Sequence, residues 1–316
     1  MILPKYPLLL ICILVLSLSA CQPQNKPENT TQLSTPTSSG PEKKARLLSP
    51  QFREYWYSGV AELSSYSLEQ GRYGELRDGE AVLIYVTEPF DLEKQVKADR
   101  KGPGTTSVLK LNRVRKFLTG IYPYSIMSSV FYPVSDNAHA LKLTTSIQEW
   151  CGHIYTQLNN RESFEVRSHS YFEGEADQDL RLPKTVLEDE LWTRLRFEPD
   201  ALPTGKKALV PSQEYLRLKH LPIKAYDATL TLSEPGESRT YTLTYPELNR
   251  TLQIHFQGTF PFRIEGWTET YPSAFGPGSP MITSSARRNK TLLTPYWRKN
   301  TNSDVSLRDT LGLSMK

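Results

Sequence analysis

The stretch SIQEWCGHIYTQLNNRESFEVRSHSYFEGEAD, residues 146–177, decides how the chain is expected to fold. Its centre, Asn159–Glu162, has the composition of a turn, because asparagine tolerates positive φ. Large apolar residues recur on a single parity on each side of that turn: Trp150, Ile154, Leu158, Phe164, Val166 and Phe172. The alternation predicts a β-hairpin with one apolar face.

The apolar residues also predict a register for this hairpin. Pairing Leu158 with Phe164 would bring large side chains together across the strands. The same register puts Trp150 opposite Phe172. Upstream of Trp150 the apolar parity reverses near Gln148, which predicts a β-bulge or a strand that crosses between sheets.

This register would gather polar side chains on the other face of the hairpin, with His153 opposite His169. The candidate polar cluster on that face is Glu149, Cys151, His153, Arg167, His169, Tyr171 and Glu173, and Tyr155 shares the face. Two histidines with a thiolate or carboxylate could form a tetrahedral zinc site, and a Cys–His pair could form a nucleophile. The alternative is a polar sheet face whose groups are satisfied by hydrogen bonds.

One amphipathic helix is expected between Pro183 and Pro199. Thr185–Glu188 has the pattern of a capping box. Leu187, Leu191, Trp192 and Leu195 would form its apolar face. Its carboxylates at Glu188, Asp189 and Glu190 would lie in the first turns, where they complement the helix dipole.

Most other segments predict strands, including Tyr55–Leu68, Ala81–Val86, Val108–Phe117, Tyr226–Leu232 and Arg239–Tyr245. We therefore expect a mainly β fold with one or more large antiparallel sheets. Its architecture would be a sandwich or a curved, partly closed barrel, with the single helix packed on the sheet.

The N-terminus has the features of an exported protein. Lys5 precedes an apolar run, Leu8–Leu18, of signal-peptide length. Leu18-Ser19-Ala20-Cys21 resembles the lipobox of bacterial lipoproteins, which implies cleavage before Cys21 and acylation of that cysteine. Gln22 in place of aspartate implies sorting to the outer membrane, with the domain on its periplasmic face.

Three segments follow from this pattern. Residues 1–20 would be the signal peptide, and residues 21–50 the lipidated cysteine with a disordered tether rich in Gln, Asn, Thr, Ser and Pro. Residues 51–316 would be a single β-rich domain. Once Cys12 is removed and Cys21 is acylated, Cys151 has no partner for an intramolecular disulfide.

Charge and motifs limit the function. The formal net charge of +4 is too small and too dispersed to indicate nucleic-acid binding. The chain has no GxGxxG, GxxxxGK[ST], GxSxG, HExxH or CxxC motif. Its 17 tyrosines and 5 tryptophans suit recognition surfaces and apolar pockets.

These features predict a non-enzymatic, lipid-anchored envelope lipoprotein with a binding or accessory role in the periplasm. Its partners would be the membrane, through the lipid anchor, and an apolar ligand or an envelope protein. We expect no cofactor unless the polar hairpin face binds zinc. The alternatives are a carrier of lipid or another apolar ligand and a metal- or Cys-dependent hydrolase.

The chain also resembles an uncharacterised family of bacterial lipoproteins. The resemblance lies in YWYSGVAELSSYSLEQGRYGE from Tyr55, IYVTEPF from Ile84, KQVKAD from Lys94, TGIYPYSIM from Thr119, QEWCGHIYTQLNNR from Gln148, SHSYFEGEADQ from Ser168 and YPELNRTL from Tyr245. Members often carry the label "septum formation inhibitor Maf". Maf nucleotide pyrophosphatases have a Ser-rich, Arg-Arg loop by their first strand, whereas the similar string Ser284–Arg288 lies near the C-terminus. The resemblance therefore implies a lipoprotein and no catalytic residues.

Overall fold

The computed structural model describes residues 46–136, 139–274 and 278–313, which all belong to one compact unit. The predicted signal peptide, Cys21 and most of the predicted tether lie outside the described residues. The folded part includes Arg46, whose backbone N–H donates to the Ser135 carbonyl at 2.7 Å and whose guanidinium lies 4.2 Å from the centre of the Phe197 ring. Residues 46–50, assigned to the tether from sequence, are thus in contact with the domain.

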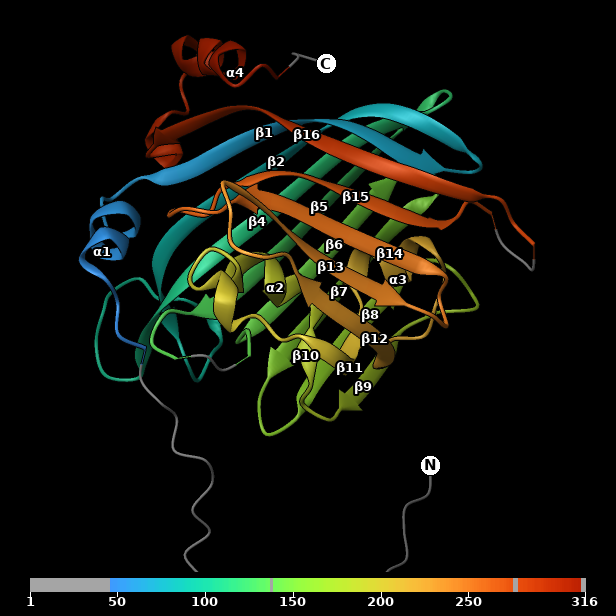
Figure 1. Ribbon diagram of the computed structural model, residues 1–316, viewed down its shortest axis with the longest axis horizontal. Helices are drawn as coiled ribbons and strands as arrows, with labels where there is room; N and C mark the ends of the chain where they lie inside the picture. Colours follow the sequence, from blue (N-terminus) through green and yellow to red (C-terminus); the bar gives the residue numbers. More distant parts are fainter. Residues whose placement is uncertain (1–45, 137–138, 275–277, 314–316) are drawn as a thin grey trace, which may run out of the picture. The chain divides into compact units, whose positions relative to one another are not determined.

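The fold is mainly β, as predicted, and its strands form one 16-stranded sheet that is not closed (Figure 1). The strands of the first half are β1 (Ala61–Arg72), β2 (Glu75–Asp91), β3 (Val96–Lys97), β4 (Thr105–Thr119), β5 (Tyr122–Pro133), β6 (Lys142–Glu149), β7 (Gly152–Asn160), β8 (Phe164–Ser170) and β9 (Gln178–Leu182). Those of the second half are β10 (Val186–Leu187), β11 (Gly205–Val210), β12 (Tyr226–Leu232), β13 (Ser238–Tyr245), β14 (Arg250–Gln257), β15 (Ile264–Pro272) and β16 (Met281–Thr294).

The two halves meet where β1 pairs with β16, and β9 and β10 lie at the two edges of the sheet. In each half, strands that follow one another in sequence pair antiparallel. There are two exceptions: the short strand β3 pairs only with β2, so that β4 is the next strand of the sheet after β2, and β10 runs parallel to β11. The sheet is therefore mixed rather than wholly antiparallel. The ends of β1, β4, β6 and β8 lie together at one end of the sheet, which we call the turn end. Helix α1 and the start of β1 lie at the opposite end.

The described residues contain four short α-helices where the sequence predicted one: α1 (Pro50–Trp56), α2 (Glu188–Arg194), α3 (Gln213–Leu218) and α4 (Leu307–Thr310). The predicted helix corresponds to α2, but it starts at Glu188 because Val186 and Leu187 form β10. Thr185 does not cap it, since its hydroxyl donates to the Ala208 carbonyl of β11 at 2.6 Å. No helix of the described residues is long and apolar enough to cross a membrane.

Helix α2 lies inside the curve of the sheet, between β4–β5 and the strands of the second half (Figure 1). Leu191, Trp192 and Leu195 of its predicted apolar face are buried. Trp192 packs edge-on against Trp267 of β15, with 5.3 Å between the ring centres. The Tyr85 hydroxyl of β2 donates to the Trp192 carbonyl at 3.0 Å. The helix thus connects strands from both halves.

The central hairpin exists, but its predicted register is wrong by two residues. Leu158 pairs with Val166, and Tyr155 rather than His153 pairs with His169. The predicted parity holds for Leu158 and Val166, which are buried on one face, but the pairing of Trp150 with Phe172 is wrong, because Trp150 lies exposed in the turn before β7. The turn occupies residues 161–163 and so begins two residues later than predicted; in it the Arg161 N–H donates to the Ser163 carbonyl at 2.9 Å.

The reversal of parity near Gln148 also has a different cause from the one predicted. It is a second tight turn at Trp150–Cys151, which joins β6 to β7. His153 therefore pairs with Gln148 of β6. A turn changes parity as a bulge does, so the sequence pattern alone did not separate the two.

Candidate functional site

Charged side chains are buried on the inner face of the sheet, around α2 and α3. The arginines are Arg113, Arg115, Arg196 and Arg250, and the carboxylates include Glu62, Glu188, Asp189, Glu214 and Glu269. A buried charge is costly unless it is paired and hydrogen-bonded. The contacts below show that each of these arginines meets at least one carboxylate.

Arg250 of β14 forms the tightest of these contacts. Its two terminal nitrogens donate to the Glu188 carboxylate at 2.5 and 2.6 Å, and its Nε donates to Glu269 at 2.7 Å. The Tyr245 hydroxyl donates to the same Glu188 carboxylate at 2.7 Å. Burial alone would raise the pKa of Glu188, but the Arg250 charge and these hydrogen bonds outweigh it and lower the pKa below its usual value.

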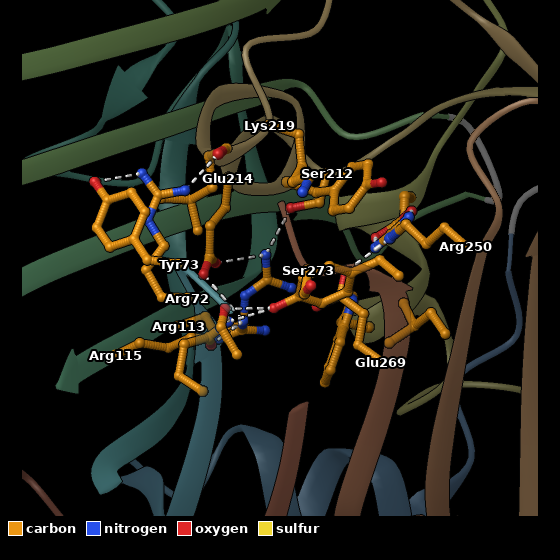
Figure 2. A pocket seen from close by; sticks show the side chains of 18 residues that line it. Arg72, Tyr73, Arg113, Arg115, Ser212, Glu214, Lys219, Arg250, Glu269 and Ser273 are labelled. Carbon is orange, nitrogen blue, oxygen red and sulfur yellow. Dashed lines mark hydrogen bonds and ion pairs between the residues drawn. The ribbon is translucent and has the colours of Figure 1, made fainter. Parts of the chain in front are cut away.

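Arg113 and Arg115 of β4 share the Glu214 carboxylate of α3 (Figure 2). Arg113 also donates to Asp189 at 2.9 Å and to the Ser212 hydroxyl at 3.1 Å. The Arg115–Glu214 contact of 3.0 Å is an ion pair without hydrogen-bond alignment. These contacts connect β4 to both inner helices.

The same arginines lie on aromatic rings. Arg113 lies 4.9 Å from the centre of the Trp192 ring, and Arg115 lies 5.2 Å from that of Trp267. Arg250 lies 4.1 Å from the centre of Tyr215. Cation–π contacts are strongest where water is excluded, so the rings complete the surroundings of these charges.

A second buried pair lies toward α1. The Arg196 guanidinium donates to both oxygens of Glu62 at 2.8 Å. Arg196 also lies 4.5 Å from the centre of the Tyr85 ring. Burial and the charge of Glu62 raise the pKa of Tyr55, whose hydroxyl donates to that carboxylate, to about 12.

A small cavity of about 30 Å³ opens beside α3, toward the turn end. Its lining includes Gln70, Arg72, Arg115, Glu214, Lys219 and Tyr271 (Figure 2). This volume holds one or two water molecules, whereas sites for small organic molecules usually measure roughly 300–1,000 Å³. The cavity therefore suits a small group at its mouth rather than a whole apolar molecule.

Two cations, Arg72 and Lys219, line this mouth, and Arg217 lies close to Arg72. Arg72, at the end of β1, donates to the Leu218 carbonyl at 2.6 Å. Lys219 donates to the Pro272 carbonyl at 2.6 Å. Burial and the nearby Arg72 charge lower the pKa of Lys219. Burial also lowers the pKa of Arg217, although its partner Glu175 opposes the shift. We call Arg72 and Lys219 the cationic mouth.

The polar cluster predicted on the hairpin is only partly brought together. Glu149 is buried, and its carboxylate accepts the backbone N–H of Cys151 at 2.7 Å. The hydrogen bond to Glu149 raises the pKa of the exposed Cys151 thiol. A raised pKa reduces the thiolate fraction that both a nucleophile and a zinc ligand need.

The remaining members of the cluster are exposed. His169 approaches Asp177 at 3.3 Å, and Arg167 pairs with Asp179 at 3.0 Å. His153, Tyr171 and Glu173 also face solvent. Among the residues that the structure describes, no three His, Cys, Asp or Glu side chains are placed to hold a metal ion. Zinc binding stays a prediction that the observed register does not support.

Sequence reasoning missed the interior network, although a signal was present. In β4, Arg113 and Arg115 have the same parity as the apolar Leu109, Leu111 and Phe117, so an alternating strand turns all five inward. The carboxylates of α2 were assigned to the helix dipole, but Glu188 and Asp189 pair with arginines of the sheet. Ser284, in the string that resembles the Maf loop, is a buried residue of β16 that hydrogen-bonds to Tyr271 at 2.8 Å.

Comparisons of the chain with protein-family models, with curated proteins and with solved structures found no match. The functional argument therefore rests on the geometry above.

Proposed function

We propose that this protein is a non-enzymatic, lipid-anchored envelope lipoprotein that binds an anionic group of its ligand at the cationic mouth. The anchor would be Cys21, and the domain would lie on the periplasmic face of the outer membrane. The observation that carries the binding proposal is the presence of both Arg72 and Lys219 in the lining of a polar cavity.

Electrostatics supports an anion at this position. Arg72 and Lys219 both line the cavity, and each donates to a backbone carbonyl, which holds the two positive charges beside its opening. Burial lowers the pKa of Lys219, and the nearby Arg72 charge lowers it further, because two like charges repel each other. An anion between them would relieve that repulsion. The hydroxyls of Tyr73 and Tyr124, 2.9 Å apart beside Arg72, add hydrogen-bonding groups at the rim.

Neither alternative function has a comparable observation. An apolar carrier needs an internal apolar space, and the cavity beside α3 is water-sized and lined by charges. A cysteine hydrolase needs an activated thiol, and the contact with Glu149 shifts the pKa of Cys151 in the opposite direction.

Phosphate binding to the purified mature protein tests this proposal. We expect inorganic phosphate to raise the temperature of unfolding, because a ligand that binds only the folded state stabilises it. Arg72→Gln and Lys219→Met should each weaken phosphate binding about tenfold, which corresponds to about 1.4 kcal/mol. Native mass spectrometry of the same protein would show whether it retains an acidic molecule that the variants lose.

Lys224→Met is the matched control, because Lys224 lies at the same end and pairs with Glu247 at 3.4 Å, away from the cavity lining. It should bind phosphate as the wild type does. Equal weakening in all three variants would mean that only general charge is involved, and the absence of any phosphate effect would refute the mouth as an anion site.

A further inference from the structure

The turn end of the sheet carries exposed apolar side chains at the tips of its hairpins. Ile121 lies in the β4–β5 turn and is 81% exposed. Trp150 lies in the β6–β7 turn and is 68% exposed, and Tyr171 follows β8 and is 70% exposed. These turns project from neighbouring strands, so the side chains point away from the body of the sheet.

Apolar exposure is concentrated at this end. Apart from Leu47, the most exposed large apolar side chains of the described residues all lie there: Ile121, Tyr171, Trp150, Leu118, Met281, Leu76 and Tyr73. Scattered apolar residues on a surface are ordinary, but a contiguous group marks an interaction site.

The tips form a connected surface rather than isolated points. Tyr122 packs against Trp150, with 6.3 Å between the ring centres. The Tyr171 ring lies directly over Gly152, where an added Cβ would fall 2.7 Å from the Tyr171 Cγ. Glycine at position 152 therefore lets Tyr171 lie beside the turn that carries Trp150.

We propose that these hairpin tips, Ile121, Trp150 and Tyr171 with their neighbours, dock into the interfacial region of a phospholipid bilayer. Tryptophan and tyrosine favour the headgroup level, and aliphatic side chains such as Ile121 favour the acyl boundary below it. Separate projecting turns can each enter a deformable planar surface. A small ligand or a peptide would instead need a groove, and the cavity nearby is water-sized.

The charges at this end identify the kind of bilayer. Arg77 pairs with Glu75, and Arg217 and His220 both meet Glu175. The tip residues Ile121, Trp150 and Tyr171 themselves carry no charge, so docking would depend on apolar contact, and a zwitterionic lipid should suffice although Arg72 and Lys219 lie at the same end.

The segment between Cys21 and Arg46 is long enough to permit this contact. This part of the inference rests on the proposed lipid anchor at Cys21. The described residues begin at Arg46, whose backbone N–H donates to the Ser135 carbonyl at the end opposite the tips. The 24 positions between Cys21 and Arg46 can span at most roughly 80 Å. Strand β4 has 15 residues and a length of roughly 50 Å. The tips can therefore reach the bilayer that holds the anchor.

Two tryptophans provide the test, because Trp150 is at the tips and Trp297 follows β16 at the opposite end, with 44% of its surface exposed. The mature lipidated protein would be reconstituted in phosphatidylcholine vesicles whose acyl chains carry bromine, a contact quencher of tryptophan. A Trp297→Phe protein reports on Trp150, and a Trp150→Phe protein reports on Trp297. Trp56, Trp192 and Trp267 are buried and contribute equally to both.

We expect at least twofold stronger quenching in the Trp150 reporter than in the Trp297 reporter, and we expect Ile121→Asp to abolish the difference. Equal quenching in the two reporters would overturn the proposal. A second result would also overturn it. In detergent micelles without lipid, acrylamide quenching of Trp150 could decrease as the protein concentration increases. That result would mean that a second copy of the chain, and not a bilayer, covers the tips. Flotation of the protein with the vesicles reports the anchor separately, so a failed anchor and a failed docking surface are distinguishable.

Discussion

Arg250 shows how single residues hold charge inside this sheet. Its guanidinium meets Glu188 and Glu269 and lies on the Tyr215 ring, so each nitrogen and one face have partners. Such a buried group adds little net stability over a well-packed apolar one, but removing one partner leaves an uncompensated charge. The network therefore specifies how β14, α2 and β15 fit together.

Arg250→Met should lower the free energy of unfolding by about 3–5 kcal/mol, because Glu188 and Glu269 would lose their shared cation. Urea unfolding followed by circular dichroism measures this. The control is Arg167→Met, which breaks an exposed pair with Asp179 and should cost less than about 1 kcal/mol. Similar costs for the two variants would mean that the buried pair is not structurally important.

The sequence predicted which face of a strand a side chain lies on better than it predicted which other side chain it contacts. Alternation correctly placed Leu158 and Val166 on a buried face, and the same alternation in β4 gives Arg113 and Arg115 the parity of its buried apolar residues. The partners Glu188 and Asp189 could not be found in this way. They lie on a helix far along the chain, and only the curvature of the sheet brings them to β4 and β14.

At the scale of elements, α2 is the helix against which strands from both halves of the sheet pack. The spacing of Leu191, Trp192 and Leu195 predicted its apolar face correctly. Its start was predicted wrongly, because Val186 and Leu187 pair with β11. A short parallel bridge leaves no pattern that distinguishes it from a first helical turn.

Leu191→Ala should cost about 2–5 kcal/mol, the range for truncating a fully buried leucine. The comparison variant is Leu293→Ala on β16, where the side chain is exposed, and it should change stability by less than about 0.5 kcal/mol. Thermal and urea unfolding of both proteins would decide. A cost below that surface range for Leu191→Ala would contradict the packing of α2.

The central hairpin marks the limit of prediction for an element. Its apolar face was correct, but the pairing was wrong by two residues because parity repeats every two positions. The prediction paired Leu158 with Phe164 because both are large and apolar, and it took no account of which residues would form the turn. The structure instead pairs Phe164 with Asn160 and leaves residues 161–163 as the turn.

At the scale of the whole molecule, acid should destabilise the fold. The pKa values of Glu62 and Glu188 are lowered below the usual 4.5 in the folded state, since arginine charges outweigh burial. A lowered folded pKa contributes stability that is present above the unfolded pKa and is lost as the pH falls through the folded value.

We therefore expect the free energy of unfolding to be nearly constant from pH 7 to about 5 and to fall steadily below about pH 4.5. Urea titrations at each pH measure it. The variant Glu188→Gln should start from a lower stability at pH 7 and lose less on acidification. A wild-type protein that grows more stable toward pH 3 would contradict the sign of these shifts.

Cys21→Ser tests the attachment of the whole molecule to a membrane. In cells, the wild type should fractionate with membranes and resist extraction by high salt, because several acyl chains give stable anchoring. The variant should lose incorporation of labelled fatty acid. Labelled lipid in the Cys21→Ser protein at the wild-type level would contradict anchoring through this residue.

The pairing of β1 with β16 has a consequence for how the chain can assemble. Every other ladder joins strands that are close in sequence, whereas Ser64 and Thr291 meet although they are 227 positions apart. Each meander can form from local contacts, but their union closes a very long loop, which is the slow kind of folding step. A circular permutant that joins the C-terminus to Arg46 through a flexible linker, so that α1 and its buried Trp56 are kept, and that opens the chain at Pro183 would bring β16 and β1 close together in sequence. Such a protein should keep the same sheet and fold faster than the natural order of strands allows.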